Sequence, residues 1–141
     1  MKKADSGKYS IEELSGERWK FDGDFPSSLI SRCYEYRKVP LNQLSADHLR
    51  LLVSQGIGLE YVMPFVLVQL KENPIVEGSY YPGDLLLAVG TVDSGYWKKN
   101  PGQLQIIISI VQNQSTAISK ELSSNRVEQI LTKLQEFSSN D

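Results

Sequence analysis

The sequence predicts an all-α fold, a single-domain compact helical bundle of about six helices. Apolar residues recur at helical spacing in most segments, and residues typical of helix starts and ends lie between those segments. No two alternating segments are joined by a hairpin turn signal. The 141 residues are enough for one domain with its own core. We expect residues 1–8 to form a flexible N-terminal tail and residues 9–138 to form the domain.

The N-terminal part contains two predicted helices. Ser10 and Glu13 have the spacing of a capping box, in which the two residues satisfy free backbone N–H groups at a helix start. Gly16 is suited to end this short helix, because glycine readily adopts a left-handed conformation. A second helix is predicted from Ser28 and ends before Pro40, since the residue that precedes a proline disfavours helical backbone.

The middle of the chain contains the most apolar segment. Ser45 is the predicted N-cap of a helix that ends near Gly56. The next helix, over residues 59–72, is apolar on most sides, so we expect it at the centre of the bundle. Pro64 should kink this helix or mark its first regular turn, and Pro74 stops it. The main apolar stripe consists of Leu59, Val62, Met63, Val66, Leu67 and Leu70.

The C-terminal part is predicted to hold three further helices. One begins with Pro82 at its first position and Asp84 in its first turn, and a loop follows it over residues 93–103. A long helix is expected over residues 104–122, although the β-branched run IIISIV leaves a strand as the alternative. The last helix should begin at Asn125 as its N-cap.

Composition narrows the possible partners. The formal net charge is -2 and the isoelectric point is about 5.5, which disfavours direct binding of nucleic acid. Apolar runs are interrupted well before the ~20 residues that a membrane crossing needs, so no membrane partner is expected. The N-terminus lacks the apolar region of a secretory signal, and the single cysteine gives no sign of an oxidising compartment. These features predict a cytoplasmic protein.

Charge is unevenly distributed along the chain. Residues 39–97 contain six acidic and two basic side chains, whereas the flanking segments each sum to +1. Such an acidic middle segment predicts an acidic face for a basic partner. The alternative is that these side chains are scattered over a solvated surface.

The side chains that usually carry catalysis or bind metals are scarce. His48 is the only histidine and Cys33 the only cysteine, so neither a two-histidine metal site nor a thiolate cluster can form. Cys33 falls on the apolar face of its predicted helix, and His48 in a first helical turn is expected to be at the surface or locally bonded. The paired Asp22 and Asp24 lie in a predicted loop over residues 18–26. We expect no cofactor and no enzymatic activity.

Polar aromatic residues gather around the helix that begins at Asp84. Tyr80 and Tyr81 precede it, and Tyr96 and Trp97 follow it, all within the acidic segment. Tyrosine and tryptophan anchor many protein interfaces, so these residues are candidates for partner binding. The alternative is that they cover the edge of the core.

One long stretch resembles a known family. Residues 32–89 read RCYEYRKVPLNQLSADHLRLLVSQGIGLEYVMPFVLVQLKENPIVEGSYYPGDLLLAV. Their order of motifs is similar to that of bacterial contact-dependent growth inhibition (CDI) immunity proteins, with departures at His48 and Ser79. The matching positions are Arg32 to Tyr34, Pro40, Leu41, Leu49 to Leu52, Gly56 to Tyr61, Pro64, Glu72 to Pro74, Glu77 to Tyr81 and Gly83 to Leu86.

The resemblance implies an immunity protein that binds and neutralises the C-terminal domain of a cognate toxin. That toxin domain is often a nuclease and therefore basic, and its inhibitor blocks the active site or the substrate surface without catalysis. The candidate contact residues are Glu60, Tyr61, Tyr80, Tyr81, Asp84, Asp93, Tyr96 and Trp97. Two alternatives remain: a small helical adaptor for another protein, and an enzyme with a carboxylate site that joins Glu60, Asp84 and His48.

Overall fold

The computed structural model describes residues 7–20 and 27–139, and within these ranges the protein is built from helices. The predicted all-α class is confirmed. The described residues form nine α-helices, one 3-10 helix and a single β-bridge between Glu77 and Pro82, with no strand. Most of the predicted tail, residues 1–6, and the segment 21–26 lie outside the described residues. Several short helices, which the sequence did not resolve, raise the number above the expected six.

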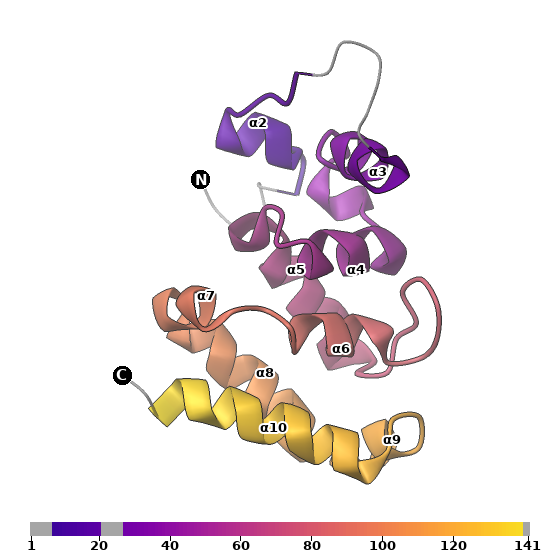
Figure 1. The fold of residues 1–141 in the computed structure, drawn as a ribbon, viewed down its shortest axis with the longest axis vertical. Helices are drawn as coiled ribbons and strands as arrows, with labels where there is room; N and C mark the ends of the chain where they lie inside the picture. Colours follow the sequence, from indigo (N-terminus) through magenta and orange to yellow (C-terminus); the bar gives the residue numbers. More distant parts are fainter. Residues whose placement is uncertain (1–6, 21–26, 140–141) are drawn as a thin grey trace.

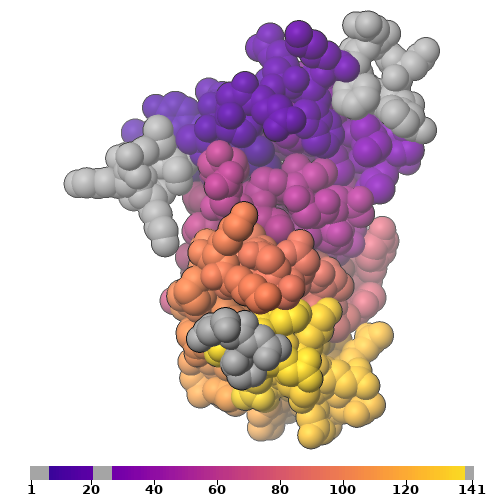
Figure 2. All heavy atoms as spheres, turned by 60° about the vertical axis from the view of Figure 1, so that its left-hand side comes forward, coloured from indigo at the N-terminus to yellow at the C-terminus, as the bar shows by residue number. Residues whose placement is uncertain are grey.

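The helices follow one another along the long axis of the molecule in nearly the order of the sequence (Figures 1 and 2). The N-terminal helices lie at one end of the view, α4 and α5 in the middle, and the C-terminal helices at the other end. Their bounds are α2 Ile11–Ser15, α3 Ser28–Tyr36, η1 Leu41–Gln43, α4 Ala46–Ser54, α5 Leu59–Glu72, α6 Asp84–Val89, α7 Ser94–Lys99, α8 Pro101–Asn113, α9 Ser115–Ser119 and α10 Ser124–Ser139.

Helix α5 connects the two halves of the bundle, as the sequence predicts. It packs against η1 and α4 on one side and against α8 on the other. Its stripe residues Val62, Met63, Val66, Leu67 and Leu70 are buried, and each contributes roughly 1.5–3 kcal/mol of hydrophobic stabilisation. Pro64 lies inside the helix and not at its start.

The predicted helix caps at Ser10 and Ser45 are present. The Ser10 hydroxyl accepts a hydrogen bond from Glu13 N, and the Glu13 carboxylate accepts one from Ser10 N. Ser45 forms the same kind of capping box with His48, whose Nδ1 accepts a hydrogen bond from Ser45 N at 3.2 Å. The imidazole also packs against the ring of Tyr36, with 4.2 Å between ring centroids. His48 is therefore locally bonded, as predicted.

Several details of the C-terminal half differ from the prediction. Pro82 lies before α6 and not at its first position, because Gly83 is the N-cap. The expected loop contains helix α7, because the Asp93 carboxylate caps the N–H of Tyr96 at 2.9 Å. The expected long helix is divided at Gln114, whose backbone leaves the helical region at φ -121°. The last helix begins one residue before Asn125, and the hydroxyl of Ser123 accepts a hydrogen bond from Arg126 N. The IIISIV run lies in a helix and not in a strand.

Gly58, at the joint between α4 and α5, should not tolerate a side chain. Its φ is +61°, and a Cβ atom there would lie 2.9 Å from Cδ1 of the buried Ile11. We expect Gly58→Ala to lower the free energy of unfolding by about 2 kcal/mol through backbone strain and overpacking, measured by urea denaturation. Gly102→Ala is the matched control, because nothing lies within 4 Å of its Cβ position. An equal loss in both variants would contradict this explanation.

Candidate functional site

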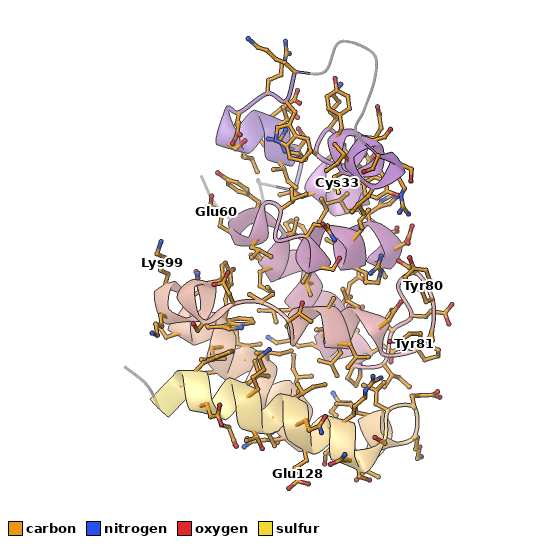
Figure 3. The ribbon with its side chains drawn as sticks, viewed as in Figure 1. Cys33, Glu60, Tyr80, Tyr81, Lys99 and Glu128 are labelled. Atoms are coloured by element: carbon orange, nitrogen blue, oxygen red, sulfur yellow. The ribbon has the colours of Figure 1, made fainter. Side chains whose placement is uncertain are left out.

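Two of the predicted contact residues lie on a loop that we call the tyrosine loop, residues 77–83. It leads into α6 and is closed by the antiparallel bridge between Glu77 and Pro82. The side chain of Tyr80 is 68% exposed and that of Tyr81 is 43% exposed, and both lie at the right-hand edge of the molecule in Figure 3. The loop thus presents two neighbouring tyrosines to solvent.

The carboxylate of Asp84 supports the tyrosine loop from behind. Asp84 is only 5% exposed. Its two oxygens accept hydrogen bonds from the backbone N–H groups of Gly78 at 2.5 Å, and of Ser79 and Tyr80 at 2.8 Å each. Burial alone would raise the pKa of this carboxyl, but the backbone hydrogen bonds from the loop outweigh burial and lower the pKa below its usual value. Asp84 is therefore ionised when it holds the loop.

Helix α4 holds the opposite side of the tyrosine loop. Arg50 Nε donates a hydrogen bond to the Ser79 hydroxyl, which in turn donates to the carboxylate of Asp47. The Arg50 guanidinium also lies over the ring of Tyr80, 4.8 Å from its centroid. A Cβ atom on Gly78 would approach Arg50 Cβ to 3.0 Å, so a glycine permits this close contact with α4. The loop is fixed between α4 and α6.

A second group of predicted contact residues lies where α5 begins and the Tyr96 hydroxyl of α7 reaches the Leu59 carbonyl at 3.4 Å. Glu60 is exposed, and the half-buried Tyr96 donates its hydroxyl hydrogen bond to Gln103 Oε1. Burial, followed by the charge of Glu60, raises the pKa of Tyr96 to about 12, so this side chain stays neutral. Burial and the same carboxylate also raise the pKa of Tyr61. Asp93 is exposed at the start of α7.

The structure does not bring these two groups together. Glu60 lies at the left-hand edge of the molecule in Figure 3, across its width from Tyr80 and Tyr81. The predicted contact residues therefore define two separate areas: the tyrosine loop, and an α5–α7 area formed by Glu60, Tyr61, Asp93 and Tyr96. Spacing along the sequence could not distinguish these areas.

Trp97 and Asp84 do not present their side chains to a partner. Trp97 is 0% exposed and packs edge-on against Tyr96, with ring centroids 5.3 Å apart. Asp84 is buried behind the tyrosine loop, where its carboxylate is occupied by backbone N–H groups. Trp97 thus belongs to the core and Asp84 to the support of the loop, so we leave both out of the candidate contact surface.

The acidic residues of the middle segment are dispersed. Asp84 is internal, and Asp47 accepts a hydrogen bond from Ser79. Glu60 and Glu72 lie at opposite ends of α5, about 18 Å apart at the usual helical rise. The acidic composition therefore does not produce one continuous acidic face.

A cavity of about 300 Å³ lies between the N-terminal segment and the start of α5, and Glu60 and Tyr61 line it. Arg37, which sequence reasoning did not select, forms part of its wall. This arginine is 3% exposed, donates to the Glu17 carbonyl at 2.7 Å and lies 4.6 Å from the ring centroid of Trp19. These contacts tie the N-terminal segment to α3, so a structural role accounts for Arg37.

The carboxylate site of the enzyme alternative is not assembled. Glu60 lines the cavity at the start of α5, Asp84 supports the tyrosine loop, and His48 caps α4. In the parts of the chain that the structure describes, no three metal-binding side chains are grouped to hold an ion. The described helices also include none with the length and apolar character required to cross a membrane.

The described residues form a small helical protein, with a loop that exposes two tyrosines and is held from behind by Asp84. The sequence model of a family described as CDI immunity proteins matches residues 13–107, about two thirds of the chain. The chain belongs to this family, as the resemblance predicted. Membership implies that the protein binds and neutralises a CDI toxin, and such proteins generally act without catalysis. No curated protein matches the chain.

Proposed function

We propose that this protein neutralises the C-terminal nuclease domain of its cognate CDI effector by covering the active site or the substrate surface. The observation that carries the proposal is the family match, which extends over residues 13–107 and includes both candidate contact areas. Neutralisation in this form needs a stable protein interface with a few buried anchors and needs no reactive groups on the inhibitor.

Charge supports a nuclease as the target. A nuclease must hold phosphate groups and therefore has a basic active-site surface. The inhibitor has a net charge of -2, and each contact area includes an exposed acid: Glu77 in the tyrosine loop, and Glu60 and Asp93 in the α5–α7 area. Opposite charges of this kind favour association and orient the partners.

We propose the tyrosine loop as the main contact and the α5–α7 area as the second candidate. Tyr80 and Tyr81 are two of the four large hydrophobic side chains that are clearly exposed among the described residues. Tyrosine buries a large rigid ring on binding and can also form a hydrogen bond, which is why it is common among interface anchors. In the α5–α7 area, Tyr96 is half-buried and its hydroxyl is already hydrogen-bonded.

Co-expression tests this function directly. The C-terminal domain of the neighbouring CDI effector is induced in bacteria with and without this chain, and growth, co-purification and nucleic-acid degradation are measured. We expect the chain to restore growth, to co-purify with the toxin domain and to stop degradation. An immunity protein from a different CDI system is the control and should not rescue growth.

Two outcomes would separate the parts of this proposal. Failure of this chain to bind or to rescue growth would contradict its role as the cognate inhibitor. Rescue of growth from a toxin that leaves DNA and RNA intact would retain the immunity role and contradict the nuclease target.

A further inference from the structure

The tyrosine loop is ordered by internal contacts before any partner binds. Three consecutive backbone N–H groups, those of Gly78, Ser79 and Tyr80, donate to one buried carboxylate. An unsupported loop with exposed rings would lose backbone conformational entropy for each residue that a partner orders. A loop that is already fixed avoids much of this loss. More of the free energy gained by burying its rings then contributes to affinity.

We propose that Asp84 and Ser79 are positioning residues for toxin recognition, which hold the tyrosine loop in the conformation that places Tyr80 and Tyr81 in the interface. This inference rests on the proposed function. Asp84 itself stays behind the loop and does not touch the toxin.

A carboxylate at position 84 can hold the loop by its backbone N–H groups, and an amide there cannot hold all of them. An ionised carboxylate only accepts hydrogen bonds, and it faces three N–H donors. In Asp84→Asn, the side-chain NH₂ would face at least one backbone N–H, which would lose its acceptor in a buried position. The substitution keeps the size of the side chain, so it weakens the hydrogen-bonding support with little change in packing.

Ser79 links the loop to α4 in a second, independent way. Its hydroxyl accepts from Arg50 Nε and donates to Asp47, which fixes the loop backbone beside the guanidinium that lies over Tyr80. Ser79→Ala removes both hydrogen bonds at a partly exposed position and keeps the backbone N–H that Asp84 binds. This variant should fold even if Asp84→Asn does not.

Two measurements on the full chain test the proposal. Hydrogen exchange of the isolated protein reports the backbone N–H groups of Gly78, Ser79 and Tyr80, and calorimetry with the purified toxin domain gives Kd. We expect Asp84→Asn to speed exchange of these groups and to weaken toxin binding about tenfold or more. Ser79→Ala should weaken binding about threefold or more, in line with the loss of its hydrogen bonds.

Leu134→Ala on α10 is the matched control for a general loss of stability. Leu134 is 1% exposed and belongs to the C-terminal half of α10, and that end of the helix lies on the opposite side of the molecule from the tyrosine loop in Figure 1. This variant should unfold at lower urea concentration and keep the Kd of the original protein. Unchanged Kd in Ser79→Ala and in a folded Asp84→Asn variant with faster exchange would overturn the positioning role. Absence of toxin binding by the unaltered chain would instead contradict the proposed function.

Discussion

Replacing Trp97 with alanine should lower the free energy of unfolding by about 3–5 kcal/mol, the usual effect of removing a large aromatic side chain from a core. Trp97 is 0% exposed and is the largest fully buried side chain among the described residues. Helix α7, which carries it, packs against α8 and α10, so the resulting cavity would lie where three helices meet. Its indole Nε1 has no hydrogen-bond partner among the residues that the structure describes, so the substitution leaves no described partner group unsatisfied.

Urea denaturation followed by circular dichroism measures this effect. Tyr80→Ala is the control, because a substitution on a side chain that is 68% exposed should change stability by no more than about 0.5 kcal/mol. If Trp97→Ala unfolded at the same urea concentration as the original protein, the core assignment would be wrong, and Trp97 would return to the candidate contact surface.

The double variant Tyr80→Ala and Tyr81→Ala should weaken binding of the toxin domain about a hundredfold or more, since interface anchors often contribute 2 kcal/mol or more each. Both rings are exposed in the free protein, and the loop that carries them is held by contacts of its backbone and of Ser79. Loss of the two rings should therefore leave the fold intact. Calorimetry gives Kd, and growth of cells that express the toxin gives protection.

Tyr9→Ala is the control for loss of an exposed tyrosine. Tyr9 is 38% exposed and lies just before α2, in the N-terminal segment and far from the tyrosine loop in the sequence. We expect normal Kd and normal protection for this variant. Unchanged toxin affinity in the double variant would show that the main contact lies elsewhere, and Glu60→Lys would then test the α5–α7 area.

The helices were predictable where a local signal marks both of their ends. The bounds of α5 are those of the predicted segment 59–72, because a strong apolar stripe lies between Gly58 and Asn73. Helix α7 was missed because its six residues are too few to show an apolar period, and its N-cap Asp93 resembles an ordinary turn residue. The break at Gln114 has no glycine or proline to mark it.

The sequence could predict which types of residue are candidates for the site, but not their burial or their contacts. Tyr80 and Tyr81 stood out as aromatic residues in a polar loop, and both are exposed. The burial of Trp97 depends on the packing of α7 against α8 and α10, and α10 lies well beyond the segment that carries Trp97 in the sequence. The role of Asp84 depends on a loop that folds back so that N–H groups up to six residues earlier reach its carboxylate. Such return contacts leave no periodic pattern in a sequence.

The arrangement of helices along the long axis has a consequence for how the protein is made. Many segments that are adjacent in the sequence are also adjacent in space, as the packing of α4 with α5 and of α7 with α8 illustrates (Figure 1). Chains dominated by such short-range contacts fold quickly. The N-terminal helices can therefore associate while the ribosome is still translating the remainder, and a newly made inhibitor becomes competent soon after its release.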